Sequence, residues 1–211
     1  MLSSCHPNKR DEAAASEHLL PPSVLIAEDE HLVASDLADQ LQRLHVQVVG
    51  PASTGAAAIE LAKTQEPAMA LLDIRMSDVD GLEAAARLMQ MGIPAVILSA
   101  YSDEEYLIRS TRAGVFGYLI KPVAEDALRT ALAVAWARFN QQCELQQEVT
   151  KLKTALEDRK LVERAKGVIM DKLGLKEADA MRRLQKQARD SRRTLADMAR
   201  AILESNDLFE K

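Results

Sequence analysis

The sequence predicts an α/β protein: a doubly wound parallel sheet of five strands, followed by a helical stalk and a small all-α domain of three helices. Two observations predict this fold class. Between residues 23 and 124, five short apolar runs alternate with amphipathic stretches, and from residue 125 onward the pattern is helical and almost free of glycine. Strands separated by helical patterns of about ten to fifteen residues indicate parallel βαβ units, whose right-handed crossovers cover both faces of the sheet.

The elements of the sheet follow from hydrophobic periodicity. The apolar runs, each expected as a buried strand, are residues 24–27, 46–49, 68–72, 95–98 and 115–120. The amphipathic stretches, each expected as a helix, are residues 31–44, 54–63, 81–90 and 103–113. The second strand is expected to close at Gly50-Pro51.

The stalk is predicted from about residue 125 to residue 159. Its apolar residues step by four, three and four, as in the a/d seam of a coiled coil: Leu145, Val149, Leu152 and Leu156. About two heptads keep this spacing, so a helical stalk is expected and dimerisation through it is a hypothesis. From residue 160, three short amphipathic patterns, broken at Gly174 and near Ser191, predict three helices with a thin core.

Composition places the chain among ordinary globular proteins, with 47% hydrophobic residues in a length of 211. No run reaches the length of a membrane span, and the polar first residues lack the pattern of a signal peptide. The two cysteines and four histidines match no metal or redox spacing. We therefore expect a cytoplasmic protein without a membrane partner, in which residues 1–22 form a flexible tail.

The net charge of -5 conceals an asymmetry between the two parts of the chain. Residues 1–150 carry 11 basic and 21 acidic side chains, whereas residues 151–211 carry 16 basic and 11 acidic ones. Such a split suggests two functions, with the basic part a candidate for binding a polyanion. A basic, solvated helix face is an equally good interpretation of the charge alone.

Polar residues follow the predicted strands at the carboxyl edge of the sheet, where open α/β folds bind ligands. They are Glu28-Asp29, Asp73, Ser99-Ala100 and Lys121-Pro122. Singly, each has an ordinary explanation, such as a helix cap at Asp29 or a solvated Lys121. Together, three carboxylates repel one another unless a hard dication lies among them, and Mg²⁺ is the natural choice. A carboxylate such as Asp73 can also attack phosphorus and form an aspartyl phosphate.

These motifs, in this order, resemble the signature of a two-component response-regulator receiver domain over residues 23 to 140. The motifs are Glu28-Asp29, Asp73 before Met76 and Gly81, Ser99-Ala100, and Gly117-Tyr118 before Lys121-Pro122. The resemblance implies a flavodoxin-like fold and phosphorylation of Asp73 by a sensor histidine kinase. The sequence departs from the family pattern at Ser77, the position after the methionine, where the family commonly has a proline.

The same resemblance assigns the roles of the site residues. Mg²⁺ would be held by Glu28, Asp29, Asp73 and the carbonyl of Arg75. The phosphoryl oxygens would be held by Ser99, the Ala100 amide and Lys121, and Tyr118 would be the switch aromatic. The main enzymatic alternative is a phosphatase with an aspartyl intermediate, which usually has a second acid two residues after its nucleophile. That position is Arg75 here, so we expect no enzyme, only a phosphoryl acceptor with at most slow autodephosphorylation.

A cationic strip is predicted on the second short helix. Arg182, Lys186 and Arg189 lie at i, i+4 and i+7, with Arg183 beside them and Arg192-Arg193 in the following turn. Arginine donates to phosphates in a planar fork, so the strip suits a nucleic acid. A solubilising face, or a DNA-reading helix-turn-helix, fits the same composition.

The sequence around this strip resembles an ANTAR domain, the RNA-binding module of transcription antiterminators, over residues 160 to 203. The motifs that carry the likeness are Arg164-Ala165-Lys166-Gly167 with Met170, then Ala180, Ala188 and Arg192-Arg193. The whole is similar to receiver-stalk-ANTAR regulators of the actinobacterial type. The resemblance implies that the active protein is a homodimer that binds tandem stem-loops in mRNA leaders. Through this binding it would affect RNA polymerase indirectly. Candidate RNA contacts are Arg164, Lys166, Arg182, Arg183, Lys186, Arg189, Arg192 and Arg193.

The expected domains are therefore a tail at 1–22, a receiver at 23–124, a helical or coiled-coil linker at 125–159 and an ANTAR-like domain at 160–211. The expected function is a phospho-aspartate-switched, RNA-binding antiterminator. Two alternatives stay open from the residues: a receiver that controls a DNA-binding output, and a phosphorylation-dependent scaffold whose basic helices meet an acidic protein.

Overall fold

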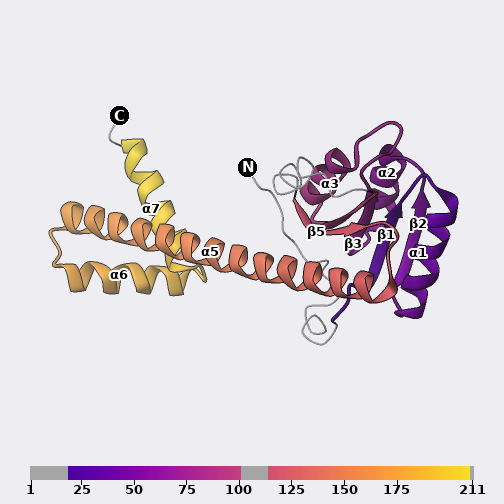
Figure 1. Cartoon of the computed structure of the whole chain (residues 1–211). Coiled ribbons are helices and arrows are strands. Elements are labelled where there is room, and N and C mark those ends of the chain that lie inside the picture. The colour runs from indigo at the N-terminus through magenta and orange to yellow at the C-terminus, as the bar shows by residue number, and fades with distance from the viewer. Residues whose placement is uncertain (1–18, 101–113, 210–211) are drawn as a thin grey trace. The chain divides into compact units, whose positions relative to one another are not determined.

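The computed structural model of the chain describes residues 19–100 and 114–209, with side chains up to residue 206 (Figure 1). The chain forms two compact units, Met1–Leu145 and Gln146–Lys211. The helix predicted at 103–113 lies outside the described residues.

The first unit is built on a parallel sheet of five strands in the order β2-β1-β3-β4-β5. The strands are β1 (Ser23–Ala27), β2 (Gln47–Ala52), β3 (Met69–Asp73), β4 (Ala95–Ser99) and β5 (Val115–Ile120). Each neighbouring pair is parallel. This order is that of flavodoxin-like folds, and the predicted fold class is confirmed.

Helices cover both faces of the sheet (Figure 1). They are α1 (His31–Arg43), α2 (Gly55–Gln65), α3 (Gly81–Gln90) and the first part of α5 (Glu125–Leu173). Successive strand residues point to opposite faces. Leu72 therefore lies in one apolar cluster with side chains of α2 and α3. Leu71 lies in a second cluster with side chains of α1 and α5.

The prediction that the second strand closes at Gly50-Pro51 is wrong, because β2 continues through both residues to Ala52. β2 is an edge strand, paired with β1 alone. A proline is tolerated at an edge because its missing N–H removes no bond from an inner ladder. Gly50 has φ +97°, a backbone conformation that favours glycine.

The second unit contains the end of α5 together with α6 (Glu177–Asp190) and α7 (Leu195–Phe209). The stalk predicted at 125–159 and the first of the three short helices predicted from residue 160 are one continuous helix of 49 residues. Nothing in this stretch ends a helix, because it contains no proline and Gly167 is its one glycine. The helices share a core of Val162, Ala165, Ile169, Ala180, Leu184, Ala188, Met198, Ala199 and Leu203.

Gly81 lets the chain pass close to the end of β3. A Cβ at this position would lie 2.0 Å from the Asp73 carbonyl oxygen, whereas a Cβ at Gly167 would meet nothing within 4 Å. Gly81→Ala is therefore expected to lower the free energy of unfolding of the first unit by about 1–3 kcal/mol. Urea unfolding followed by the fluorescence of Trp136 measures this, since Trp136 is the single tryptophan of the chain and packs in the first unit.

Gly167→Ala is the matched control for this substitution. It should leave the Trp136 transition of the first unit unchanged and stabilise the C-terminal part of α5, which belongs to the second unit, by about 1 kcal/mol, because alanine is the better helix former. Equal shifts of the Trp136 transition in the two variants would contradict the role given to Gly81.

Candidate functional site

The candidate site lies at the carboxyl edge of the sheet, where polar residues end or follow four adjacent strands. Asp73 ends β3, Ser99 ends β4, Glu28 follows β1 and Lys121 follows β5. Glu28, Asp73 and Ser99 are buried, with 2%, 5% and 7% of their surface exposed. The parallel order of these strands brings the side chains together although they are far apart in the sequence.

The Lys121 ammonium lies between two carboxylates. Its Nζ is 2.8 Å from Oδ2 of Asp73 and 2.6 Å from Oε2 of Glu28. Its backbone N–H donates to the carbonyl of Ser99 at 2.8 Å, which fixes the lysine at the end of β4. Burial by itself lowers the pKa of Lys121, but the hydrogen bonds and charges of the two acids outweigh it and raise that pKa above its usual value.

The negative charge of the cluster is only partly balanced. Burial raises the pKa of Glu28, the contact with Lys121 lowers it in part, and the charge of Asp73 raises it again. Oε2 of Glu28 is buried and faces the Lys121 ammonium, which Glu28 shares with Asp73. A buried carboxylate whose negative charge is only partly compensated favours the binding of a further cation.

Three acids of the cluster can hold that cation. Glu28, Asp29 and Asp73 each offer a carboxylate oxygen, and these oxygens lie within 4.8 Å of one another. Hard oxygen donors of this kind suit Mg²⁺, which binds through a few carboxylates and keeps several waters. Asp29 is exposed, so the cluster is open to solvent on one side.

The loop after Asp73 is held by acids that the sequence did not single out. Asp78 accepts from the N–H groups of Gly55 at 2.9 Å and Ala56 at 3.2 Å, at the start of α2. Its pKa is lowered by its bonds to backbone N–H groups, that of Val79 first. Asp80 caps α3 by accepting from Leu82 N–H at 2.9 Å. An acid just before a helix signals such a cap, but the link between Asp78 and α2 is visible only in three dimensions.

The segment after Lys121 is also held in place, by α1. The Gln40 side chain donates to the carbonyl of Val123 at 3.0 Å, and Arg43 donates to Glu125 at 2.7 Å. The side chains of Arg43 and Glu125 are 55% and 43% exposed, so water screens this ion pair and it contributes little to stability. Gln40 is buried and makes the more durable link between α1 and the site.

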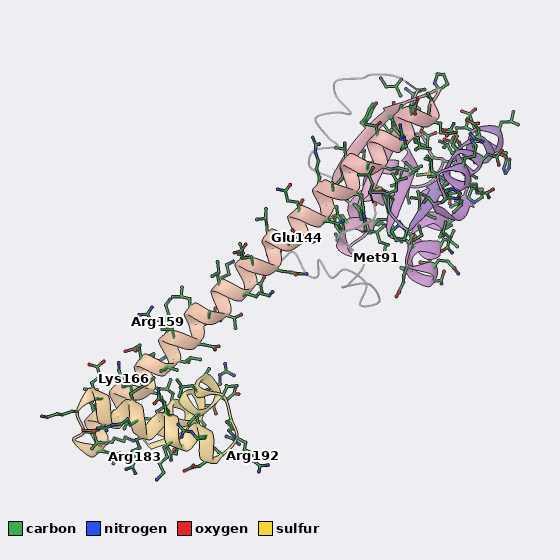
Figure 2. The ribbon with its side chains drawn as sticks, turned by 90° about the horizontal axis from the view of Figure 1, so that it is seen from below. Met91, Glu144, Arg159, Lys166, Arg183 and Arg192 are labelled. Atoms are coloured by element: carbon green, nitrogen blue, oxygen red, sulfur yellow. The ribbon has the colours of Figure 1, made fainter. Side chains whose placement is uncertain are left out.

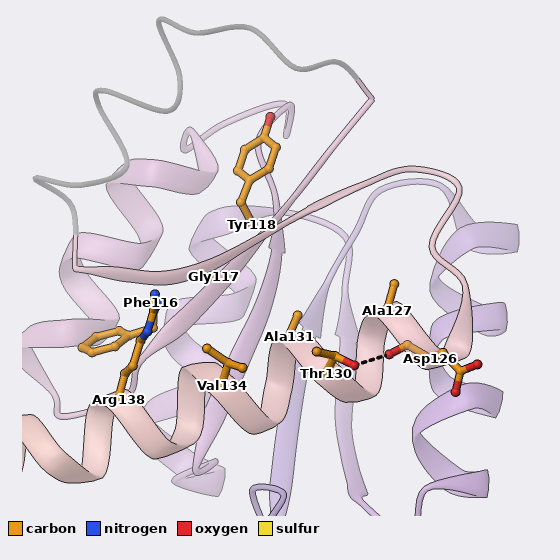
Figure 3. Close-up of a pocket in the computed structure, with 9 residues that line it drawn as sticks. All are labelled: Phe116, Gly117, Tyr118, Asp126, Ala127, Thr130, Ala131, Val134 and Arg138. Carbon is orange, nitrogen blue, oxygen red and sulfur yellow. Dashed lines mark hydrogen bonds between the residues drawn. The ribbon is translucent and has the colours of Figure 1, made fainter.

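Tyr118 lies on β5 beside a groove between this strand and α5 (Figure 3). The groove has a volume of about 550 Å³ and is lined by Phe116, Gly117, Tyr118, Asp126, Ala127, Thr130, Ala131, Val134 and Arg138. Tyr118 is also partly buried against the cluster that contains α2 and α3. Ala100 is exposed and directly follows Ser99.

The predicted cationic strip lies on the surface of the second unit. The exposed side chains are those of Arg164, Arg182, Arg183, Lys186, Arg189, Arg192 and Arg193, of which Arg183 and Arg192 are labelled in Figure 2. Lys166 differs, because its side chain is only 12% exposed and its Nζ lies 2.5 Å from Glu163 and 2.6 Å from Glu177. Lys166 therefore links α5 to the start of α6.

Models of known protein families match both parts of the chain. Residues 24–133 match the response regulator receiver domain, and residues 150–203 match the ANTAR domain. The chain is a response regulator with an ANTAR domain.

Among its relatives, this response regulator is 40% identical over 187 residues to the transcriptional regulatory protein PdtaR of Mycobacterium tuberculosis. The alignment covers 88% of this chain and 91% of that protein. The transcriptional regulatory protein DesR of Bacillus subtilis is 34% identical over 111 residues, 52% of this chain and 56% of that one. The resemblance to actinobacterial ANTAR regulators, predicted from the sequence motifs, is confirmed.

Two solved structures show the likeness of the receiver to known folds. The signal receiver domain of a modulated diguanylate cyclase from Desulfovibrio desulfuricans is 37% identical, with a TM-score of 0.54, and the match covers 58% of this chain and 98% of that one. The signal receiver domain of NarL from Mycobacterium tuberculosis is 28% identical, with a TM-score of 0.53, over 56% of this chain and 98% of that one. Within residues 19–100 and 114–209, no helix is long and apolar enough to cross a membrane.

Mg²⁺ is expected to stabilise the receiver against urea. A ligand that binds only the folded state adds about 2.7 kcal/mol at one hundred times its Kd. Asp29→Asn should remove most of this gain without harming the fold, because Asp29 is exposed. The measurement is urea unfolding followed by Trp136 fluorescence, with and without Mg²⁺.

The control for this prediction is Asp126→Asn. Asp126 is also exposed and pairs with Arg129, outside the carboxylate cluster. An equal loss of the Mg²⁺ effect in both variants would mean that the ion acts through general screening of acidic charge.

Proposed function

We propose that this response regulator is switched by phosphorylation of Asp73 and that its ANTAR domain binds RNA stem-loops as a transcription antiterminator. The observation that carries the first part is the position of Asp73, buried at the end of β3 and paired with Lys121 beside two further acids. A structural acid at a strand end needs neither a buried lysine nor a carboxylate cluster. An acceptor of a phosphoryl group needs both.

The phosphoryl donor is a phosphohistidine of a sensor histidine kinase. A carboxylate oxygen of Asp73 attacks phosphorus, a P–O bond forms, and the P–N bond to the histidine breaks with its electrons returning to the imidazole. Mg²⁺ held by Glu28, Asp29, Asp73 and the carbonyl of Arg75 would neutralise negative charge on the phosphoryl oxygens. We assign the chain the role of a phosphoryl acceptor at Asp73, with at most slow autodephosphorylation.

Lys121, Ser99 and Ala100 respond to the new group. The Lys121 ammonium, already 2.8 Å from Asp73, exchanges one carboxylate oxygen for a phosphoryl oxygen. The Ser99 hydroxyl and the Ala100 amide donate to the remaining oxygens. Tyr118 lies on β5 opposite Ile97 of β4, close to Ser99 at the end of that strand, and it lines the groove beside α5, so movement of Ser99 would give it room to move. The phosphoryl charge thus biases a two-state element at β5 and α5.

The ANTAR domain supplies the output. Its exposed arginines and Lys186 form a strip suited to phosphates and to stacking on loop bases. Lys166 is assigned a smaller part in RNA contact than the other candidates, because its ammonium already pairs with two glutamates. The functional divisions we assign are a tail at 1–22, a receiver at 23–124, a linker at 125–159 and the ANTAR part at 160–211.

Judged by charge alone, two other functions of the basic C-terminal helices are possible. A DNA-binding output would prefer a duplex, and a protein scaffold would show weak RNA binding that is indifferent to hairpins. The match to the ANTAR domain over residues 150–203 favours RNA. The relative PdtaR is named a transcriptional regulatory protein, which agrees with an output in transcription.

The output is tested by binding to a tandem-hairpin RNA and to a matched DNA duplex over a range of salt concentrations. Arg183→Ala combined with Lys186→Ala should weaken RNA binding about tenfold or more. If each residue contacts one phosphate, the salt slope should fall by about 0.7–0.9 per contact. Lys151→Ala removes an exposed charge of α5 outside the strip and should leave the affinity unchanged. Tighter binding to the duplex would contradict the proposal.

A further inference from the structure

A cluster of three charged side chains joins the last part of α5 to the start of α6. Nζ of Lys166 on α5 lies 2.5 Å from Oε2 of Glu163, one turn earlier on the same helix. It also lies 2.6 Å from Oε1 of Glu177, the first residue of α6. We call these three residues the clamp. The Lys166 side chain is 12% exposed, whereas both glutamates lie at the surface.

The clamp is a poor place for an RNA phosphate. Two carboxylates surround one ammonium, so the cluster carries a net negative charge, which repels an anion. The hydrogen bonds to Glu163 and Glu177 raise the pKa of Lys166, so its ammonium stays charged and occupied by the two acids. The same contact lowers the pKa of Glu177, which keeps that partner ionised. The geometry therefore gives Lys166 a task other than contact with RNA.

The apolar contacts between α5 and α6 determine the position of α6 only weakly. Small side chains form much of the shared core: Ala165 on α5, with Ala180 and Ala188 on α6. Apolar burial is non-directional, and a single well-ordered packing depends on side chains that interlock by shape, which alanine does little to provide. An ion pair has a defined distance and direction. The clamp can therefore fix the rotation and the register of α6 against α5.

The rotation of α6 matters because the cationic strip lies on the side of this helix away from the core. Arg183 and Lys186 are exposed, whereas Ala180 and Leu184 are buried. Lys166 lies on α5 and Arg183 on α6 (Figure 2). With 3.6 residues per turn, a rotation of α6 by one residue position would turn the strip by about 100°. A small loss of register would thus aim the strip elsewhere.

We propose that Lys166 is a positioning residue for RNA binding: through the clamp it sets the orientation in which α6 presents Arg183 and Lys186, and it does not itself hold RNA. This inference rests on the proposed RNA binding. It divides neighbouring residues of the ANTAR-like motif by role. Ala165 packs in the core, Lys166 orients α6, and Arg164 is an exposed candidate contact.

The sign of the effect of Glu177→Ala tests the proposal. This change removes a negative charge, so an effect of charge alone predicts tighter binding to a tandem-hairpin RNA. Loss of the clamp predicts binding that is weaker by about threefold to fivefold. Glu177 is exposed, so its removal does not disturb the core. Glu204→Ala, which removes an exposed acid of α7 outside the clamp, should leave the affinity unchanged or raise it. Tighter binding by Glu177→Ala would overturn the proposal.

Exchange of the clamp charges in the full chain separates positioning from contact. Lys166→Glu should weaken RNA binding, because it places three carboxylates together. Adding Glu177→Lys restores one ammonium between two carboxylates and should return the affinity to within about threefold of the wild type. Lys166→Met should leave the salt slope of binding unchanged, whereas loss of a phosphate contact lowers it by about 0.7–0.9. A double variant as weak as Lys166→Glu, or a lowered slope in Lys166→Met, would overturn the proposal.

Hydrogen exchange of the backbone amides of residues 178–184 gives a readout that needs no RNA. Exchange should be faster than in the wild type in Lys166→Glu and Glu177→Ala, close to the wild type in the double variant, and unchanged in Glu204→Ala. Unchanged exchange in Lys166→Glu would overturn the clamp. A wild type that binds no RNA would overturn the proposed function and the positioning role with it, whereas the exchange result would still show whether the clamp orders α6.

Discussion

The Lys121 ammonium lies between two buried carboxylates, and the rest of the receiver depends on this contact. The order of the parallel strands forces Glu28, Asp73 and Lys121 to the same edge of the sheet. Once they are there, one positive charge cannot balance the acids, because Asp29 adds a third carboxylate within 4.8 Å. The site is therefore ready for a dication and for an incoming group that the ammonium can bind.

The surroundings of the site keep this contact in place. Asp78 and Asp80 hold the loop after Asp73 to the starts of α2 and α3, and Gln40 holds the segment after Lys121 to α1. β4, which ends at Ser99, lies between Asp73 on β3 and Tyr118 on β5. We propose that a change of charge at Asp73 acts through these two strands.

Much of the fold and of the candidate site could be predicted from the sequence. The features that could not be predicted depend on contacts between distant parts of the chain or on signals that the sequence does not carry. The bounds of α3 and β5 agree with the predicted ones to the residue, because each shows a clear apolar period between breakers. The end of β2 was wrong because tolerance of Pro51 depends on an edge position, which only the strand order reveals. The stalk and the first short helix, which the sequence motifs separated at residue 160, form one helix because a change of motif does not end a helix. The pairing of Lys166 with Glu177 crosses a turn between two helices, so no periodicity indicates it.

The central claim is that phosphorylation of Asp73 controls the ANTAR output. The most direct measurement compares the affinity of the wild type and of Asp73→Asn for a tandem-hairpin RNA, in Mg²⁺, with and without a small phosphoryl donor. We predict that the donor tightens binding of the wild type and has no effect on Asp73→Asn. Equal affinity of the two proteins in the presence of the donor would contradict the claim and leave a receiver that is not coupled to its output.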